Sequence, residues 1–400
     1  MDDYSLTFFG VSGNFDFEME KKRLIDNLNW FKSIEVQEFT FYKKWEELQD
    51  SSLASRFPES GVAKNDIWAP VDLQNEELTI KEILELKPKL VIVSNDDYYE
   101  KTWNSLRLYG HTAEFNNTPG RLIKFLLIDD ITNKILGFAS ISSEMSSLKC
   151  RDEVIGWPKD VRMKPGGKGT LVNSMQCPCI ASTQPFGYNF LGGKLMATML
   201  TTSTVRNDYF NRYNDVLVGL TTTSLYGQSS MYNGLKWWKG VGTSAGKIPI
   251  QPSPEFYDIW HAWIKDNLKE EYLKKMTQRE GISGPVTSPK LRVMQMIFKS
   301  VGVKISDYNH GYQRGCYYSN FYENGYDFLC GKITSDKLKM KPLFEGDSKL
   351  ILDWWRPKAI ERYKRLKLEN RLKSDKLFYS NMKGLKYEEA KEKYFGAVGR

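Results

Sequence analysis

Residues 151–246 decide the fold of this chain. They contain, in order, the segments RDEVIGW (151–157), VNSMQCPCI (172–180), FLGGKLMATML (190–200) and DVLVGLTTTS (215–224). This order predicts a strand, a glycine-containing turn, a helix and a strand, followed by a Tyr- and Trp-rich turn segment that ends in glycines. Alternating strands and helices are typical of an α/β domain. Such a domain can bind a phosphate- or acyl-bearing ligand at the N-terminus of its helix.

The segments that precede this stretch extend the pattern. Apolar spacing predicts a helix over 20–34, a buried strand followed by a helix over 86–110, and a β-hairpin over 120–142. Residues 4–11 and 35–42 are typical of short strands.

The segments that follow are mainly helical. We expect one helix over 189–214, amphipathic helices over 255–276 and 288–302, and an ordered loop over 310–331. The last sixty residues are expected to be helical and basic.

A chain of 400 residues exceeds what one compact core usually holds. Prolines gather just beyond residue 248 and mark a boundary. We therefore predict an α/β (α+β) protein with three domains: an α/β extension over 1–88, a core domain over 89–248, and a helical domain with a basic tail over 249–400.

The composition is that of a folded soluble protein, with 41% hydrophobic and 26% charged residues. No run of eighteen apolar residues occurs, and the acidic start MDDYSLTFFG does not resemble a secretory signal. A cytoplasmic protein is therefore expected. The odd count of five cysteines argues against a disulfide framework. Cys177 and Cys179 are expected to be buried strand residues, and no metal is expected.

Basic residues gather toward the C-terminus of the chain, whose net charge is +8. The residues that we expect to bind nucleic acid are Arg356, Arg362, Lys364, Arg365 and Lys367. A solvated helix face would show the same charges. A phosphate-contacting surface would use them to release condensed counterions. Interleaved rings such as Trp354 and Tyr363 could stack on exposed bases.

Three motifs could serve a ligand. Gly192 and Gly193 would let a phosphate or pantetheine approach the backbone at a helix start, although close helix–sheet packing explains the pair equally well. The run KPGGKG (164–169) resembles a phosphate cradle, but no G-K-[ST] helix follows it, which favours a loop. Tyr226 and Tyr232 follow a strand, where a tyrosine either protonates a leaving group or merely packs.

Other features of the sequence limit the classes of reaction that the chain could catalyse. The chain has no Ser-His-Asp order, H-E-x-x-H or Walker sequence, which argues against nucleophilic hydrolysis and metalloprotease chemistry. Trp237 and Trp238 are expected in the core. Arg151 and Asp152 would face opposite sides of a predicted strand, one of them toward solvent.

Together these segments resemble a known family. GRLIKFLLID (120–129), RDEVIGW, VNSMQCPCI, FLGGKLMATML and MYNGLKWWKGVGTSAGK (231–247) follow one another as in the Druantia-type domain of unknown function, DUF4338, of prokaryotic anti-phage and mobile-element proteins. The resemblance covers about 90–247. Its most specific pieces are Arg151-Asp152 with Ile155-Gly156-Trp157, and the segment with Tyr232, Trp237, Val241 and Gly242.

The layout is also similar to the GNAT-type acyltransferase fold, especially that of the DNA-modifying Mom protein of phage Mu. Those proteins place a hairpin, a strand, a ligand-gripping helix and a strand that leads to a Tyr-bearing segment. The resemblance implies a GNAT-like mixed sheet flanked by helices. The residues that it implies at a donor site are Asn189, Gly192, Gly193 and Lys194. It implies Tyr232 as the acid, with Asp152 or Arg151 for proton transfer or orientation.

Two features depart from these families. The chain lacks a Q/R-x-x-G-x-G/A loop, and it has LTTTS, with Thr221–Thr223, where the Druantia-type strand carries a Glu-Thr pair. These departures favour a diverged transferase or an inactive relative over a standard acetyl-CoA enzyme.

The resemblance implies a DNA-modifying transferase, of phage or mobile-element origin, that attaches an acyl or amino-acid-derived group to a nucleobase. DNA is the expected partner, and acyl-CoA or an aminoacyl compound is the expected donor. The alternative is a non-enzymatic nucleic-acid-binding component of an anti-phage defence or a phage assembly. A structural phage protein would have neither DNA affinity nor a pocket at Gly192.

Overall fold

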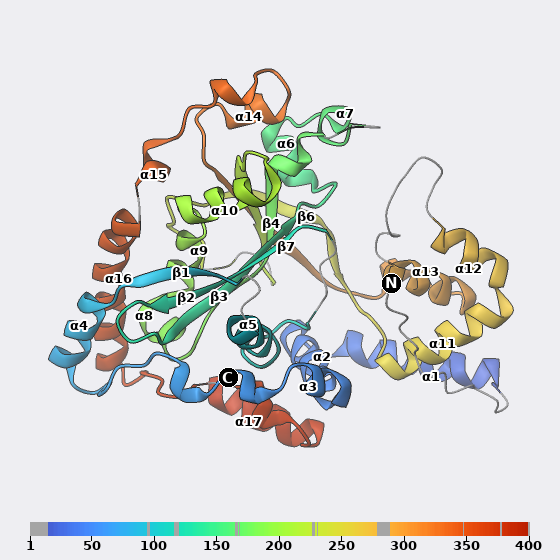
Figure 1. Ribbon diagram of the computed structural model, residues 1–400. Coiled ribbons are helices and arrows are strands. Elements are labelled where there is room, and N and C mark those ends of the chain that lie inside the picture. The colour runs from blue at the N-terminus through green and yellow to red at the C-terminus, as the bar shows by residue number, and fades with distance from the viewer. Residues whose placement is uncertain are drawn as a thin grey trace. The chain divides into compact units, whose positions relative to one another are not determined.

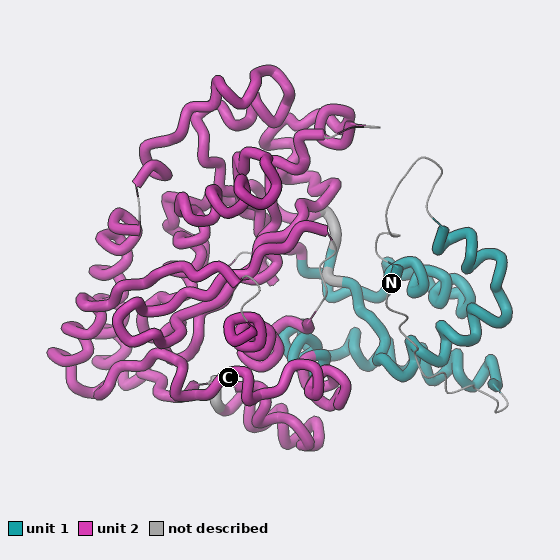
Figure 2. Tube along the Cα trace, in the orientation of Figure 1, with its two compact units in different colours: residues 1–43, 247–312 teal, residues 44–246, 313–400 magenta. Residues whose placement is uncertain are grey.

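The computed structural model describes residues 15–93, 97–115, 120–164, 167, 169–225, 229, 231–277, 289–346, 348–376 and 378–398. The chain falls into two units, shown in teal and magenta in Figure 2. Unit 1 comprises 1–43 and 247–312, and unit 2 comprises 44–246 and 313–400. The predicted domain boundaries at 88 and 248 stay a prediction. The strand predicted over 4–11 lies outside the described residues.

Unit 1 is helical. Its elements are α1 (Phe17–Ser33), the start of α2 (Val36–Gln49), α11 (Pro254–Asn267), α12 (Lys269–Met276), α13 (Pro289–Ser300) and the 3₁₀ turn η4 (Ile305–Asp307). Leu28 of α1, Trp260 of α11 and Ile297 of α13 are fully buried in one apolar core. Three helices thus share their apolar faces.

The helices predicted over 20–34 and 288–302 are confirmed as α1 and α13. The strand predicted over 35–42 is wrong, because this segment begins α2 and buries Val36, Phe39 and Lys43 at helical spacing. The single helix predicted over 255–276 is wrong too. Its backbone leaves the helical region at Leu268, with φ −125° and ψ 38°, between α11 and α12.

A mixed sheet of seven strands organises unit 2 (Figure 1). The strands are β1 (Pro88–Val93), β2 (Leu122–Asp129), β3 (Ile135–Ser143), β4 (Ser174–Ser182), β5 (Gly219–Thr223), β6 (Lys239–Pro249) and β7 (Asn309–Asn320). Their order across the sheet is β1-β2-β3-β4-β5-β7-β6. β4 and β5 pair in parallel, whereas β1–β2, β2–β3, β3–β4 and β5–β7 pair antiparallel.

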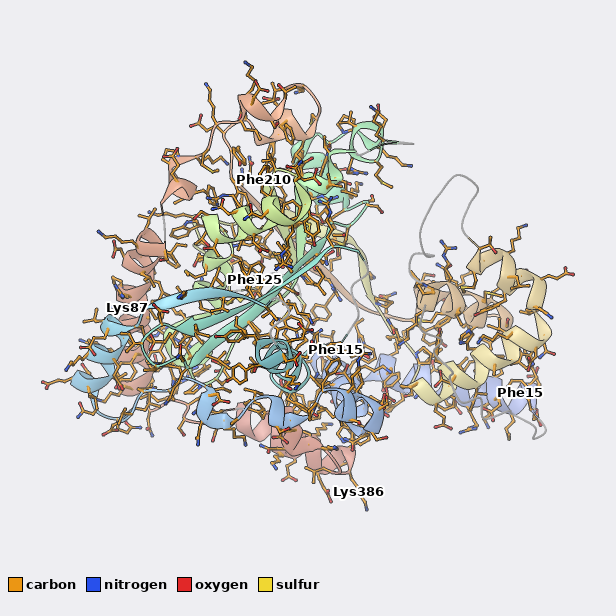
Figure 3. The ribbon with its side chains drawn as sticks, viewed as in Figure 1. Phe15, Lys87, Phe115, Phe125, Phe210 and Lys386 are labelled. Atoms are coloured by element: carbon orange, nitrogen blue, oxygen red, sulfur yellow. The ribbon has the colours of Figure 1, made fainter. Side chains whose placement is uncertain are left out.

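Helices cover both faces of this sheet. Ala139 and Ile141 of β3 face the core that contains α8 (Phe186–Phe190), α9 (Gly192–Met199) and α16 (Ser348–Leu368). Phe138, next to Ala139 on β3, faces the other side of the sheet, and its ring centroid lies 6.5 Å from that of Trp103 of α5 (Asp97–Tyr109). Phe125 of β2 lies in the interior, whereas Phe210 lies at the surface (Figure 3).

The remaining elements of unit 2 are short. They are α3 (Ser51–Arg56), η1 (Glu59–Gly61), η2 (Lys64–Asp66), α4 (Glu76–Glu85), α6 (Lys149–Ile155), α7 (Lys159–Arg162), η3 (Thr170–Asn173), α10 (Ser203–Tyr213), α14 (Gly325–Leu329), η5 (Ser335–Lys337), α15 (Pro342–Glu345), η6 (Tyr379–Met382) and α17 (Tyr387–Val398). No helix within the described ranges is both long and apolar enough to cross a membrane.

The predicted class, a mixed α/β protein, is confirmed. The strand and helix predicted over 86–110, the hairpin, and the helical C-terminal region are confirmed as well. Cys177 and Cys179 are buried strand residues, and Trp237 and Trp238 belong to the core, as predicted.

Three predictions for unit 2 are wrong, and a fourth is wrong in part. The helix expected over 189–214 is three helices, since Leu191 adopts a left-handed conformation (φ 56°) between α8 and α9, and α10 begins separately. The strand expected at 151–157 is α6, which Gly156 closes with φ 69°. The loop expected over 310–331 contains β7 and α14. The predicted Tyr- and Trp-rich turn segment is confirmed over 231–238, but its glycine-containing end forms β6.

Candidate functional site

The two parallel strands at the centre of the sheet diverge. β4 and β5 are in register only at Ser174↔Gly219, Met175↔Leu220 and Gln176↔Thr221. Beyond these pairs, residues of both strands line one cavity. A gap between parallel strands leaves room for a ligand inside the sheet layer.

A β-bulge in β4 shapes this gap. Ser142 of β3 pairs with Gln176 and Ser140 pairs with Cys179, so that Ile141 alone lies opposite Cys177 and Pro178. Proline has no N–H to donate, and therefore suits the unpaired position of a bulge. The strand continues past Pro178 to Ser182.

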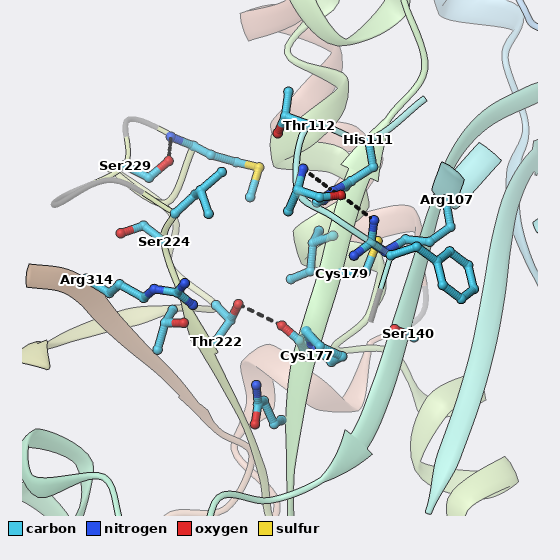
Figure 4. A pocket seen from close by; sticks show the side chains of 18 of the residues that line it. Arg107, His111, Thr112, Ser140, Cys177, Cys179, Thr222, Ser224, Ser229 and Arg314 are labelled. Carbon is cyan, nitrogen blue, oxygen red and sulfur yellow. Dashed lines mark hydrogen bonds between the residues drawn. The ribbon is translucent and has the colours of Figure 1, made fainter. Parts of the chain in front are cut away.

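The cavity has a volume of about 440 Å³ and lies entirely within unit 2 (Figure 4). The cationic side chains on its wall belong to Arg107, Lys124 and Arg314. Hydroxyl and thiol groups come from Ser140, Cys177, Cys179, Thr222 and Ser224. Among the described residues that line the cavity, none is acidic. The wall therefore favours an uncharged or anionic ligand.

Tyr232 forms part of the wall and is 5% exposed. Its ring stacks on Tyr317 at 4.3 Å between centroids. Its hydroxyl is hydrogen-bonded to Thr222, and the Thr222 hydroxyl donates to the Cys177 carbonyl at 3.0 Å (Figure 4). Burial is the largest cause that raises the pKa of Tyr232 well above its usual value. The phenol therefore keeps its proton at neutral pH.

A second wall comes from the end of α5. Arg107 donates to the Ala113 carbonyl at 2.7 Å and to the Glu114 carbonyl, and His111 Nδ1 accepts from Ala113 N at 3.0 Å. Burial, followed by the charges of Arg107 and Lys44, lowers the pKa of His111 well below its usual value. His111 is therefore neutral at neutral pH.

A buried ion pair holds the same wall from behind. The Lys44 ammonium lies 2.7 Å from Glu47 Oε2, and Glu47 Oε1 accepts a hydrogen bond from Phe115 N. Burial lowers the pKa of Lys44 to about 8. This ion pair holds the segment that contains His111 in place at the wall of the cavity.

Arg151 and Asp152 lie together in a different place. The Arg151 guanidinium is fully buried and lies 2.6 Å from both Glu144 Oε1 and Asp152 Oδ1. Asp152 also pairs with Arg162 at 2.7 Å. Glu144 Oε2 accepts hydrogen bonds from Ser174 and Thr221, one on each parallel strand. Neither Arg151 nor Asp152 lines the cavity beside Tyr232. Arg151 is fully buried, whereas the Asp152 side chain is 13% exposed.

The residues predicted for the donor surround the start of α9. Asn189 exchanges two hydrogen bonds with the backbone of Lys373, at 2.7 and 3.1 Å. A Cβ on Gly192 would lie 2.3 Å from Ser182 Oγ, so close packing accounts for this glycine. A Cβ on Gly193 would lie 2.9 Å from Met231 Sδ, and Met231 lines the cavity. Lys194 Nζ donates to the Asn233 carbonyl. The helix start therefore adjoins the cavity wall.

The basic residues predicted to bind nucleic acid lie on α16. Arg356 donates to the Leu86 carbonyl at 2.8 Å, and Lys364 and Lys367 each lie 3.5 Å from Glu76. Arg362 lies over the Tyr188 ring at 5.1 Å, and Arg365 is exposed. None of the five lines the cavity.

Some predicted features lie outside the described residues, namely Tyr226 and, in the KPGGKG run, Pro165, Gly166 and Lys168. Within the described ranges, no group of three or more His, Cys, Asp or Glu side chains could hold a metal ion. Sequence reasoning missed Arg107, Thr222 and Glu144. A lone arginine in the apolar segment that ends the helix predicted over 86–110 is a signal for Arg107.

Comparisons with known proteins place the chain in a family. The family model described as Druantia protein DruA matches residues 69–331. The curated Druantia protein DruA of Escherichia coli (strain UMEA 4076-1) is 26% identical over 266 residues, which cover 60% of this chain and 61% of the relative. The chain therefore spans less than two thirds of that relative's length. No solved structure gives a significant match. The predicted Druantia resemblance is confirmed, and the chain belongs to the Druantia protein DruA family.

Proposed function

We propose that the chain is a DNA-modifying transferase of anti-phage defence, which attaches an acyl or aminoacyl group to a nucleobase. The observation that carries the proposal is the cavity of about 440 Å³ between the diverging strands β4 and β5, with the protonated Tyr232 phenol on its wall. Such a buried polar group in a concave site is typical of catalytic pockets.

The arrangement of the elements around the cavity supports a GNAT-like transferase. The hairpin of β2 and β3 comes first, and α6, α7 and η3 separate it from β4. The helices α8, α9 and α10 follow β4, and β5 then leads to Tyr232. This order is similar to the one that the sequence resemblance implies. Acyl-CoA and an aminoacyl compound are the donors considered, and the cations Arg107 and Arg314 suit an anionic part of either donor.

In the proposed reaction, the exocyclic amine of a base attacks the carbonyl carbon of the donor. A C–N bond forms, and the bond from that carbon to the sulfur or oxygen of the donor breaks. Tyr232 gives its phenolic proton to this leaving atom, and the proton released by the amine returns to Tyr232. The hydrogen bond to Thr222 orients the phenol. The products are the acylated base and the protonated leaving group.

Nucleoside mass spectrometry on DNA from cells that express each variant tests this proposal. Wild type should produce a new nucleoside mass, and Tyr232→Phe should not. The matched control is Tyr363→Phe, which removes the hydroxyl of a fully buried tyrosine that donates to the Leu73 carbonyl at 2.8 Å. This control should still produce the new mass. A new nucleoside at wild-type yield with Tyr232→Phe would remove Tyr232 from the mechanism.

The second candidate function is a non-enzymatic nucleic-acid-binding component of the defence system. The exposed basic residues of α16, such as Arg365, favour it. It predicts unchanged nucleosides together with DNA binding that weakens as salt rises.

A further inference from the structure

We infer that a row of five cations in unit 2 binds the phosphodiester backbone of a single nucleic-acid strand beside the cavity. The members of this basic row are Lys194, Lys358, Arg362, Arg365 and Arg371. The inference deepens the proposed function by naming the acceptor as an unpaired strand, and it rests on that function only for the role of the cavity.

The basic row is continuous in space. Burial is the largest cause that lowers the pKa of Lys194, and the charge of the nearby Lys358 adds to it. Lys358, Arg362 and Arg365 follow at i, i+4 and i+7 on one face of α16. Burial also lowers the pKa of Arg362, and the charges of Arg365 and Arg371 act in the same direction. Lys194 therefore lies near Lys358 at one end of the row, and Arg365 and Arg371 both lie near Arg362 at the other.

The cations of the row repel one another. Within the described part of the chain, the ion pair that Glu369 makes with Arg371 offsets this repulsion only in part. Glu369 lies 2.7 Å from Arg371. Lys358 and Arg365 are exposed. By contrast, Lys364 and Lys367 on the same helix are both paired with Glu76. Phosphates bound along the row would neutralise its excess positive charge, which is the main source of affinity for nucleic acids.

Aromatic rings alternate with the cations. The Lys358 ammonium lies 5.7 Å from the centroid of the half-buried Trp354, and the Arg362 guanidinium lies 5.1 Å from that of Tyr188. Arg371 Nη2 donates to the Tyr188 hydroxyl at 3.5 Å. A basic surface interleaved with rings is the arrangement that holds unpaired bases. A base must also leave the duplex stack before an enzyme can modify it.

The row begins at the wall of the cavity. Lys194 donates to the Asn233 carbonyl, two residues after Met231, and Met231 both lines the cavity and contacts Gly193. A strand that follows the row toward Lys194 therefore approaches the site where the donor is proposed to bind.

A binding titration of the full chain tests the inference. The probes are a labelled 20-nucleotide single-stranded DNA, its duplex, and an RNA of the same sequence. The test variant Lys358→Gln/Arg365→Gln removes two exposed charges of the row. The control Lys332→Gln/Lys337→Gln removes two charges from side chains that are 68% and 70% exposed elsewhere in unit 2. Equal unfolding midpoints would show that both variants fold.

Wild type should bind the single strand more tightly than the duplex. The test variant should lose about tenfold in affinity for the single strand, and its slope of log affinity against log salt should fall by about 1.4, near 0.7 for each lost phosphate contact. The control should bind like wild type. Tighter binding of RNA than of DNA would support the row and assign RNA as the acceptor.

Equal weakening by both variants, or a duplex that binds as tightly as the single strand, would overturn the inference. The titration contains no donor, so its outcome is independent of catalysis. If the row variants bind normally while Tyr232→Phe abolishes modification, the inference about the basic row is wrong and the proposed transferase function is supported. If the row variants lose binding and no nucleoside is ever modified, the inference about the basic row is supported and the proposed transferase function is wrong.

Discussion

Thr222 of β5 bridges to Cys177 of β4 at the point where the two parallel strands part. Its hydroxyl donates to the Cys177 carbonyl at 3.0 Å, and it is also bonded to the Tyr232 phenol. The backbone pairing ends one residue earlier, at Gln176↔Thr221. At this point a side-chain hydrogen bond takes the place of the backbone hydrogen bonds between the two strands. This bond fixes the position of both strands where the gap begins.

Replacing Thr222 by Val keeps the shape of the side chain but removes this bridge. The buried Cys177 carbonyl and the Tyr232 hydroxyl then lose a partner, so the free energy of unfolding should fall by about 1–3 kcal/mol. Urea unfolding measures the change. Thr222→Ser should retain most of the stability, and Thr223→Val, at a half-buried position on the same strand, is the control. Equal stability of Thr222→Val and wild type would contradict the bridge.

We expect Arg151 to stabilise the folded protein. Arg151→Met leaves Glu144 and Asp152 without their buried partner, and should lower the free energy of unfolding by about 3–5 kcal/mol. Chemical denaturation checks this value. Adding Glu144→Leu removes one orphaned charge, so the double variant should be more stable than Arg151→Met alone. A double variant that is the less stable of the two would refute this account.

Gly192 and Gly193 should respond differently to alanine. A Cβ on Gly192 would meet Ser182 Oγ at 2.3 Å and the Phe186 ring at 2.5 Å, and such overpacking costs about 1–3 kcal/mol. A Cβ on Gly193 meets only the flexible end of Met231 at 2.9 Å. Thermal unfolding should show a clear loss for Gly192→Ala and little change for Gly193→Ala. The reverse order would mean that α9 packs differently.

His111 should make the protein sensitive to acid. Its folded-state pKa lies well below the ordinary value of 6.5 because loss of water around the ring and the charges of Arg107 and Lys44 disfavour its protonation. Below pH 6.5 the unfolded chain binds a proton that the folded state does not bind. Stability therefore falls as pH drops, by up to about 1.4 kcal/mol per pH unit from this group. Unfolding free energies of wild type and His111→Gln at pH 7 and pH 5 give the effect as a difference. The same pH dependence in both proteins would exclude His111 as its source.

The sequence predicted the elements whose signal is local. The hairpin of β2 and β3 and the amphipathic α1 have clear periodicity over their whole length, so neighbouring residues suffice to specify them. β7 was missed because its Gly-, Tyr- and Asn-rich sequence is typical of a loop. It is a strand because it pairs with β5 in the interior of the sheet.

The features of the candidate site also fall into two groups, those that the sequence predicts and those that only the structure shows. The sequence by itself determined the family, the mixed α/β class and the importance of Tyr232 as a candidate acid, since these depend on motifs in order along the chain. Only the tertiary structure decided that Tyr232 meets Thr222 at a cavity, while Arg151 and Asp152 hold a buried ion network elsewhere. The physical reason is that strand register, a bulge at Pro178 and burial arise from contacts between segments far apart in the chain, which local sequence patterns do not encode.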